Sequence, residues 1–440
     1  MRFHGTMWVN PAGHLEIGRC DTVELARVFE TPLYVLDEEL FRENCRAYQR
    51  VFGTRGGRVI YAGKAGLNLA ICRILAEEDV GLDVVSGGEL YTAVQGRFPM
   101  SRVYFHGNNK TPAELRMALE AGIHRIVVDN LDELELLGRL TAEHGAEADI
   151  LLRLSPGIEA HTHEYIRTGQ IDSKFGLVIP GGQALEGVRR SLETDGVRLR
   201  GLHCHIGSQI FELEPYAEAA RVLLGFARQA REETGWTIEE LDLGGGLGIY
   251  CSAGDDPPSV ESLAETIFGA VAEAAGRHGL PVPEVAVEPG RSIAGPAGTT
   301  LYTVGTIKQI PEVPRTYVAV DGGMGDNPRP ALYGARYEAC LANKADREPD
   351  TTVSLAGRCC ESGDMLIWDA RIPAVKGGDI VAVSCTGAYT YSMSGNYNRF
   401  PRPAMVLVRD GQAELIVRRE SYADLIRNDI VPARSRRRMG

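Results

Sequence analysis

The sequence predicts a two-part protein: a (β/α)8 TIM-like barrel, followed by a C-terminal β-sandwich or β-barrel domain that N-terminal strands complete. Two observations predict the barrel. Eight apolar, strand-like runs alternate with helical stretches, and several of these runs end in polar residues. Buried strands that alternate with helices are typical of a parallel sheet, and polar groups at strand ends are typical of the active face of such a barrel. The third observation is the loss of helical periodicity after about Gly295, which predicts the all-β part.

The eight barrel strands are expected where short apolar runs end. These runs end at Tyr61-Ala62, Asp83-Val84-Val85, Val103-Tyr104-Phe105, Ile126-Val127-Val128, Leu151-Leu152-Arg153-Leu154, Leu202-His203-Cys204-His205, Leu241-Asp242-Leu243 and Val285-Ala286-Val287. Helical patterns lie between them. One covers 112–119 after a candidate N-cap at Thr111, and another covers 218–231 with apolar residues at helical spacing.

β-branched and aromatic runs dominate the C-terminal part, and turn residues such as Asp321-Gly322-Gly323 and Asp410-Gly411 separate them. Strand-like runs cover residues 300–304, 317–320, 380–383 and 404–408. We therefore expect a barrel domain over residues 37–294 and a β domain made of residues 1–36 and 295–440. The basic tail, about 434–440, is expected to be disordered.

Composition excludes several classes of protein. The 440 residues carry a net charge of −12, which argues against a nucleic-acid or anionic-membrane surface. The start of the chain has no signal-peptide pattern, and no apolar run is long enough to span a bilayer. Nine scattered cysteines, an odd number, fit reduced thiols better than a disulfide framework. The expectation is a cytoplasmic protein with no nucleic-acid or membrane partner.

Lys64 is the most informative single residue. It follows the apolar run Val59-Ile60-Tyr61-Ala62. A lysine at the mouth of a buried strand is costly unless its amine has an ionic or covalent partner. Such a lysine is a good candidate for a Schiff base.

Other strand ends carry groups that suit a phosphate-bearing, planar cofactor. Glycines 244–246 follow the seventh strand, where backbone N–H groups can approach a phosphate. The eighth strand ends in Glu288-Pro289-Gly290-Arg291. After the sixth strand, one histidine could stack on the cofactor while Ser208 binds its phosphate. A metal site of His203, His205, His161 and His163 is the alternative, although no carboxylate or cysteine pair completes a recognisable spacing.

An amine, phosphate-binding glycines, a stacking histidine and a carboxylate together suit pyridoxal phosphate. In that context the chain resembles the fold-type III pyridoxal-phosphate decarboxylases from about Pro32 to Pro403. The matching motifs are Tyr61-Ala62-Gly63-Lys64-Ala65, His205-Ile206-Gly207-Ser208, Gly244-Gly245-Gly246, Glu288-Pro289-Gly290-Arg291, Cys360-Glu361-Ser362-Gly363-Asp364 and Gly387-Ala388-Tyr389.

The resemblance implies pyridoxal 5'-phosphate as the cofactor and a role for each matching residue. Lys64 would form the Schiff base, His205 would stack on the ring and Glu288 would keep the pyridine nitrogen protonated. The phosphate would be held by Ser208, Gly246, the Pro289-Gly290-Arg291 turn and the Tyr389 hydroxyl. Cys360 would donate the proton that replaces the lost carboxylate, and a thiol is a plausible acid because its ordinary pKa lies near 8.5.

Within the family, the chain is most similar to members that convert meso-2,6-diaminopimelate to L-lysine and CO2, the last step of lysine biosynthesis. The marks of this similarity are the segments 165–169, 172–176, 329–333 and 360–362. The resemblance implies that Arg291, Arg329 and Tyr333 hold the far carboxylate, that Glu361 pairs with the distal amine, and that Tyr389 contributes to the substrate site. It also implies a homodimer with shared active sites, because Cys360 and Glu361 come from the second subunit.

Three alternatives differ in chemistry. The first is a decarboxylase for ornithine, arginine or carboxynorspermidine, against which Arg329, Tyr333 and Glu361 speak. The second is a non-catalytic paralogue, which should lack the lysine or the thiol. The third is racemase-like chemistry, which needs a second base facing Lys64.

The chain also departs from the family pattern. Gly63 and Gly66 flank the lysine, and Arg358-Cys359 precedes Cys360. Residues 160–174, a long polar stretch after the fifth strand, are the candidate lid.

Overall fold

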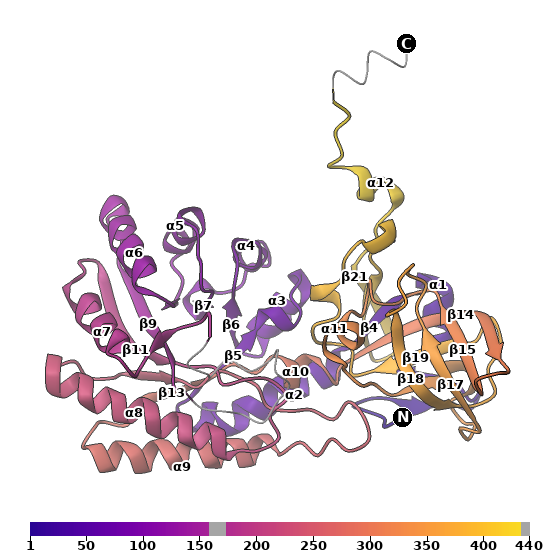
Figure 1. Ribbon diagram of the computed structural model, residues 1–440, viewed down its shortest axis with the longest axis horizontal. Coiled ribbons are helices and arrows are strands. Elements are labelled where there is room, and N and C mark those ends of the chain that lie inside the picture. The colour runs from indigo at the N-terminus through magenta and orange to yellow at the C-terminus, as the bar shows by residue number, and fades with distance from the viewer. Residues whose placement is uncertain (158–172, 433–440) are drawn as a thin grey trace. The chain divides into compact units, whose positions relative to one another are not determined.

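The computed structural model describes residues 1–157 and 173–432, which form two compact units (Figure 1). One unit comprises Glu39–Ala297 with Gly387–Ser392. The other comprises Met1–Glu38, Gly298–Thr386 and the chain from Met393 onward. Several predicted features lie outside the described residues. They are the motif segment 165–169, residue 172 of the segment 172–176, most of the candidate lid and the tail 434–440.

The first unit is a closed barrel of eight parallel strands. In the order in which they pair around the ring, these are β5 (Arg58–Ala62), β6 (Gly81–Val84), β7 (Val103–Phe105), β8 (Arg125–Val128), β9 (Ala148–Ser155), β11 (Val197–His203), β12 (Glu240–Asp242) and β13 (Glu284–Val287). β13 pairs with β5 and closes the ring. The eight predicted strands are confirmed, and the structure adds a short strand, β10 (Leu177–Val178), beside β9.

Consecutive residues along the barrel strands are buried, so both faces of each strand are covered, which is why the strands read as continuous apolar runs. Ile60, Tyr104, Val127, Leu151 and Ala286, from five different strands, form one buried cluster. Burying a side chain such as Ile60 fully contributes about 1.5–3 kcal/mol to stability.

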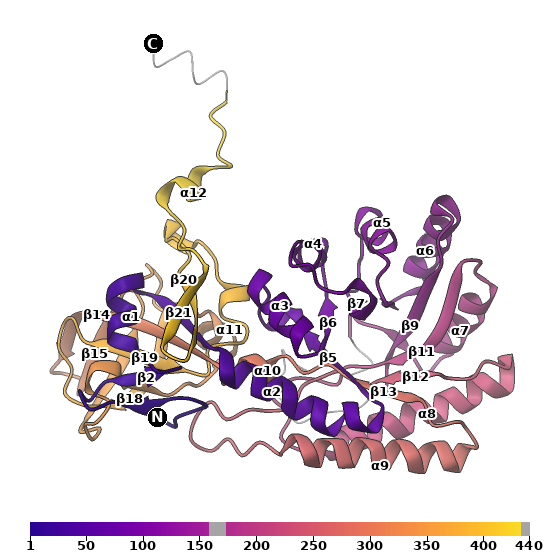
Figure 2. The same cartoon turned by 180° about the vertical axis from the view of Figure 1, so that it is seen from behind.

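Helices surround the barrel strands, as Figures 1 and 2 show from opposite sides. They are α2 (Glu38–Val51), α3 (Leu69–Glu77), α4 (Gly87–Gln95), α5 (Pro112–Ala121), α6 (Leu131–His144), α7 (Gln183–Glu193), α8 (Glu214–Thr234), α9 (Val260–His278) and the short α10 (Arg291–Ala294). The expected N-cap at Thr111 is present. Its side chain accepts from the Glu114 N–H, and Glu114 reaches back to the Thr111 N–H, which completes a capping box. The helix predicted over 218–231 is α8, which is longer at both ends.

The second unit is built on a sheet in the order β18-β17-β15-β14-β4-β20-β21. Its strands are β4 (Leu33–Asp37), β14 (Gly298–Ile310), β15 (Arg315–Val320), β17 (Thr351–Ala356), β18 (Met365–Ile372), β20 (Ala404–Arg409) and β21 (Gln412–Val417), and β19 (Ile380–Ser384) pairs with both β14 and β16 (Ala339–Leu341). The N-terminal strand β4 lies between β14 and β20, so the chain's beginning does complete this domain.

The remaining elements of the second unit are small. The strands β1 (Trp8–Val9), β2 (Leu15–Ile17) and β3 (Cys20–Asp21) form a separate sheet beside α1 (Thr22–Phe29). The described chain also contains α11 (Arg329–Tyr333), α12 (Tyr422–Ile426) and several short 3-10 turns.

The predicted domain limits, 37–294 against 1–36 with 295–440, differ slightly from the two compact units. Each edge shifts by two or three residues, and the segment 387–392 groups with the barrel. Its backbone explains this grouping, because the Tyr389 N–H donates to the Ala65 carbonyl at 2.7 Å, next to Lys64.

Candidate active site

Lys64 lies directly after β5, at the carboxyl end of the barrel, in the 3-10 turn Gly63–Ala65. Its Nζ is 3.8 Å from an Asp83 carboxylate oxygen, and Asp83 is fully buried at the end of β6. Burial disfavours the charged amine, but the charge of Asp83, with Tyr389 and Glu288, outweighs burial and raises the pKa of Lys64. Gly63 permits this approach, because a Cβ there would lie 2.6 Å from the Asp83 carbonyl.

Glu288, which follows β13, is buried between two histidines. His106 Nε2 lies 2.7 Å from one carboxylate oxygen, and His203 Nε2 lies 3.4 Å from the other. Burial alone would raise the pKa of Glu288, but the two histidines hold it well below its usual value. Asp242 is buried at the end of β12, and burial beside the Glu288 charge raises the pKa of Asp242 well above its usual value.

Glycine backbone forms a cradle beside these side chains. Gly246 has a φ of +111°, and a Cβ there would lie 2.3 Å from the Gly207 carbonyl. Any larger residue would therefore be strained and would clash with the turn after β11. The neighbouring Gly245 N–H donates to His205 Nδ1 at 3.3 Å, which ties that histidine to the glycine turn. Burial, reinforced by the Lys64 charge, lowers the pKa of His205 well below its usual value.

A cation sits next to this cradle. Arg291, at the start of α10, is buried, and its guanidinium donates to Ser208 Oγ at 2.9 Å. The same guanidinium lies over the Tyr389 ring, 4.7 Å from its centroid. Gly290 lets the turn approach β5, because a Cβ there would be 2.9 Å from the Ala62 side chain. The barrel therefore offers glycine N–H groups, a hydroxyl and a guanidinium, which together suit a phosphate.

Four other predicted site residues belong to the β unit. Arg329 is buried in α11, with its guanidinium 5.2 Å from the centroid of the Tyr333 ring. The exposed Cys360 and Glu361 lie in the loop between β17 and β18.

The buried Asp364 shapes the loop that carries Cys360. Its carboxylate accepts from the N–H groups of Met324 (2.6 Å) and Cys359 (2.8 Å). The Cys360 N–H donates to the Asn398 side chain. Arg358 places its guanidinium over the Phe400 ring, 4.0 Å from the ring centroid.

Of the alternative metal site, only His203 and His205 lie among the described residues. His203 and His205, expected to converge, have different partners, Glu288 and the Gly245 N–H. A strand turns alternate side chains to one face, but β11 ends at His203, so His205 no longer follows that rule. His161 and His163 lie outside the described residues.

Sequence reasoning missed five side chains at the same barrel end: Asp83, His106, Asp129, Arg153 and Asp242. They lie in or just after β6, β7, β8, β9 and β12. Arg153 is 3.8 Å from Asp129, and its guanidinium covers the Phe175 ring at 4.3 Å. The signal was available, because each of these polar residues lies at the end of an apolar strand run.

The comparisons with known proteins agree with this geometry. Residues 38–295 match the family described as "Pyridoxal-dependent decarboxylase, pyridoxal binding domain". The chain is 51% identical to the diaminopimelate decarboxylase of Bacillus subtilis (strain 168), over 98% of both chains. It is 46% identical to the enzyme of that name from Synechocystis sp., over 98% of this chain and 93% of the other.

Solved structures give the same result. A diaminopimelate decarboxylase from M. jannaschii in complex with L-lysine matches with a TM-score of 0.91 and 37% identity, over 98% of this chain and 99% of that one. A lysine/ornithine decarboxylase from Vibrio vulnificus in complex with putrescine matches less well, with a TM-score of 0.75 and 25% identity, over 88% and 98%.

The fold and the barrel site define a pyridoxal-phosphate-dependent decarboxylase. More narrowly, the chain belongs to the diaminopimelate decarboxylase family.

The described residues fit the cofactor. An amine is available for its aldehyde and a buried carboxylate for its ring nitrogen. Both oxygens of Asp83 and one oxygen of Asp242 are buried without a hydrogen-bond partner among the described residues, as expected of a site completed by a bound group. The glycine cradle at Gly246, which a Cβ would fill, suits the phosphate.

Proposed function

We propose that this protein decarboxylates meso-2,6-diaminopimelate to L-lysine and CO2. The observation that carries the proposal is that Lys64, the buried Glu288, the glycine cradle at Gly246 and the neighbouring Arg291 converge at one barrel end. The relatives of this chain bear the name diaminopimelate decarboxylase. Two solved relatives bind L-lysine, the product of this reaction.

The cofactor, held through its aldehyde, supplies an electron sink for the bond that breaks when a carboxylate leaves as CO2. Lys64 would supply the amine that holds the aldehyde. Glu288 would hold a proton at the ring nitrogen, and His205 would pack against the ring. Gly246, Ser208, the Pro289-Gly290-Arg291 turn and Tyr389 bind the phosphate.

The remaining roles involve mainly residues of the β unit. Cys360 delivers a proton from Sγ to the carbon that has lost CO2. Arg329 and Tyr333, together with Arg291, bind the far carboxylate, because a guanidinium can hold a carboxylate through two parallel hydrogen bonds. Glu361 pairs with the distal amine. A diamine-forming decarboxylase would instead need an acidic far pocket.

Substrate choice is tested by incubating the purified, cofactor-loaded protein with meso-diaminopimelate, ornithine, arginine or carboxynorspermidine. We expect CO2 and L-lysine from meso-diaminopimelate and little turnover of the others. The Lys64→Ala variant is the control for background release. Equal turnover of ornithine would contradict the substrate assignment, and stereochemical exchange without CO2 would point to racemase chemistry.

We also propose a homodimer in which Cys360 and Glu361 complete the barrel site of the other subunit. Mixing Lys64→Ala with Cys360→Ala chains, after dissociation and reassociation, then creates one intact site per mixed dimer. The mixture should recover about a quarter of wild-type activity, since half of random pairs are mixed and each has one working site of two. No recovery, with mixed dimers present, would contradict shared sites.

The cytoplasm is the proposed location, because all nine cysteines are free thiols. No helix of the described chain has the length and apolar character that a membrane span requires.

A further inference from the structure

Glu288 is enclosed by three buried titratable side chains that have no role in the chemistry above: His106, His203 and Asp242. All four groups are at least 96% buried and come from four different barrel strand ends. One nitrogen or oxygen atom from each lies within 4.8 Å of the others. The two imidazole rings also contact each other edge to face, with centroids 4.8 Å apart. The group is therefore rigid, and Glu288 has little freedom to rotate.

The contacts of Glu288 and Asp242 are specific to individual carboxylate oxygens. One Glu288 carboxylate oxygen lies 2.7 Å from His106 Nε2, and the other lies 3.4 Å from His203 Nε2 with hydrogen-bond geometry. Asp242 accepts the Gly244 N–H on Oδ1, while its Oδ2 has no hydrogen-bond partner among the described residues. A neutral Asp242 would carry its proton on Oδ2, the oxygen that no backbone donor occupies.

Electrostatics explain why histidines suit Glu288 better as partners than an arginine would. An isolated buried carboxylate takes up a proton, and a neutral Glu288 could not hold a positive charge on a ring nitrogen. An arginine beside Glu288 would keep the carboxylate ionised but would repel that same positive charge. A neutral N–H donor avoids the repulsion, and His203 is such a donor because burial lowers its pKa to about 3.

We propose that His106, His203 and Asp242 are positioning residues that keep Glu288 ionised and aimed at the ring nitrogen of pyridoxal phosphate. This inference rests on the proposed role of Glu288 and adds the residues that make that role possible. His106 and His203 contact Glu288 directly, Asp242 lies within 4.8 Å in the same cluster, and all three act through Glu288.

Other charged groups face this cluster and belong to its titration. Asp83 lies 3.8 Å from His106 Nε2, and Lys64 lies beyond Asp83. Arg153 acts electrostatically on His203, Glu240 acts on Asp242, and Cys204 faces the charges of Asp242 and Glu288. All of these groups except Lys64 are buried. Their charges therefore act on the cluster without exposing it to water.

The test measures the ring nitrogen itself. Wild-type and variant full-length protein is loaded with pyridoxal phosphate carrying 15N in the ring, and the 15N chemical shift is followed against pH. We expect a protonated nitrogen in the wild type. In His106→Leu and His203→Leu, the pKa of the ring nitrogen should fall by about one unit, a tenfold change in its protonation constant.

Conservative variants separate this role from packing. His106→Gln and His203→Gln keep an N–H donor and should restore most of the wild-type shift. Asp242→Asn should behave like the wild type because Asp242 acts as a neutral donor, whereas Asp242→Ala should not. His124→Leu, a histidine at the opposite end of the barrel, is the matched control and should leave the 15N profile unchanged.

A second measurement covers variants that fold poorly. Among molecules that bind cofactor, we compare affinity for pyridoxal phosphate with affinity for its analogue in which carbon replaces the ring nitrogen. The wild type should prefer the natural cofactor, and removing a donor should reduce that preference about tenfold. A purely structural loss would weaken both ligands equally and would overturn the inference.

Glu288→Gln tells the two proposals apart. If this variant keeps a protonated ring nitrogen, the proposed role of Glu288 is wrong. If Glu288→Gln loses the proton while both leucine variants match the wild type, only the inference about His106 and His203 is wrong.

Discussion

At the scale of single residues, the position of a polar side chain at the end of a barrel strand indicates its chemical role. Lys64, Glu288 and Arg291 were identifiable because each is a costly residue at the end of an apolar run. Asp83, which raises the pKa of Lys64, ends a similar run but has no distinctive motif. Its role becomes visible only when β5 and β6 pair and bring the two side chains to 3.8 Å.

The adjacent cysteines 359 and 360 provide a matched test of the proton donor. Cys360→Ala should lower kcat by about 10²–10⁴, the usual contribution of a general acid. Cys359→Ala should change kcat little. Its backbone N–H, which binds Asp364, is retained, and the pKa of its thiol is raised to about 11 by burial and by Asp364. Steady-state turnover with equal cofactor loading is the measurement, and similar losses in both variants would count against Cys360 as the donor.

At the scale of elements, the turns after the barrel strands shape the cofactor site. The turn after β12 approaches the turn after β11 so closely that position 246 accepts only glycine. The same need for close approach explains Gly63, one of the departures from the family pattern. In the β unit, the turn between β20 and β21 has positive φ at both Asp410 (50°) and Gly411 (79°), as expected for a two-residue hairpin.

Two glycine-to-alanine substitutions compare the effect of an added Cβ in a crowded turn with its effect at an uncrowded helix position. Gly246→Ala should weaken cofactor binding at least about tenfold, because its Cβ would displace the Gly207 carbonyl and distort the cradle. Gly269→Ala, inside α9 with nothing within 4 Å of its new Cβ, should raise the free energy of unfolding by about 0.5–1 kcal/mol. Cofactor titration and urea unfolding check the pair, and a wild-type cofactor affinity in Gly246→Ala would contradict the cradle.

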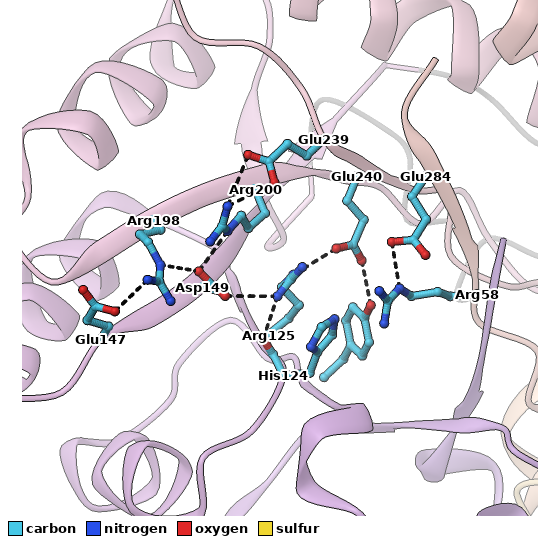
Figure 3. Close-up of polar contacts among 11 residues, drawn as sticks. Arg58, His124, Arg125, Glu147, Asp149, Arg198, Arg200, Glu239, Glu240 and Glu284 are labelled. Atoms are coloured by element: carbon cyan, nitrogen blue, oxygen red, sulfur yellow. Dashed lines mark hydrogen bonds and ion pairs between the residues drawn. The ribbon is translucent and has the colours of Figure 1, made fainter. Parts of the chain in front are cut away.

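At the scale of the whole barrel, the two ends have different tasks. The proposed cofactor site lies at the carboxyl end, and the amino end carries a network of ion pairs (Figure 3). In this network Glu240 accepts from the Tyr104 hydroxyl (2.7 Å) and from Arg125 (2.9 Å), while Asp149 binds Arg198 and Arg200. These residues lie near the first positions of their strands, so the network ties together strands that are distant in sequence.

Glu239 and Glu240 are adjacent and test how much the network stabilises the barrel. Glu240 is 1% exposed, and Glu240→Gln should cost about 3–5 kcal/mol because Arg125 loses the carboxylate at 2.9 Å and keeps Asp149, at the longer distance of 3.4 Å, as its acidic partner. Glu239 pairs with Arg200 at the surface, and Glu239→Gln should cost less than about 1 kcal/mol. Urea unfolding of cofactor-free protein is the measurement. Equal effects would mean that burial does not govern this network.

Acid should destabilise the same end of the barrel. Burial, with the charges of Arg125 and Arg58, lowers the pKa of His124 from 6.5 to about 4. The unfolded chain therefore binds a proton at a higher pH than the folded chain. The stability that His124 contributes is complete above pH 6.5 and is lost as pH falls through about 4.

His124→Gln should lose less stability than the wild type between about pH 7 and pH 4.5, because glutamine does not titrate. His144→Gln, at the exposed end of α6, is the control and should follow the wild-type curve. Urea midpoints across this pH range check the expectation, and parallel curves for His124→Gln and the wild type would contradict it.

The sequence by itself determined the alternation of strands and helices, the change to a β domain, the lysine at a strand end, the glycine turn after the seventh barrel strand and the family. These features are local, because each depends on periodicity, on turn residues or on a motif within a few positions. Only the tertiary structure decided that His106, His203 and Asp242 surround Glu288 and that His203 and His205 have different partners. Residues from distant strands meet only when the ring closes, and the direction of each side chain after a strand ends depends on the path of its turn.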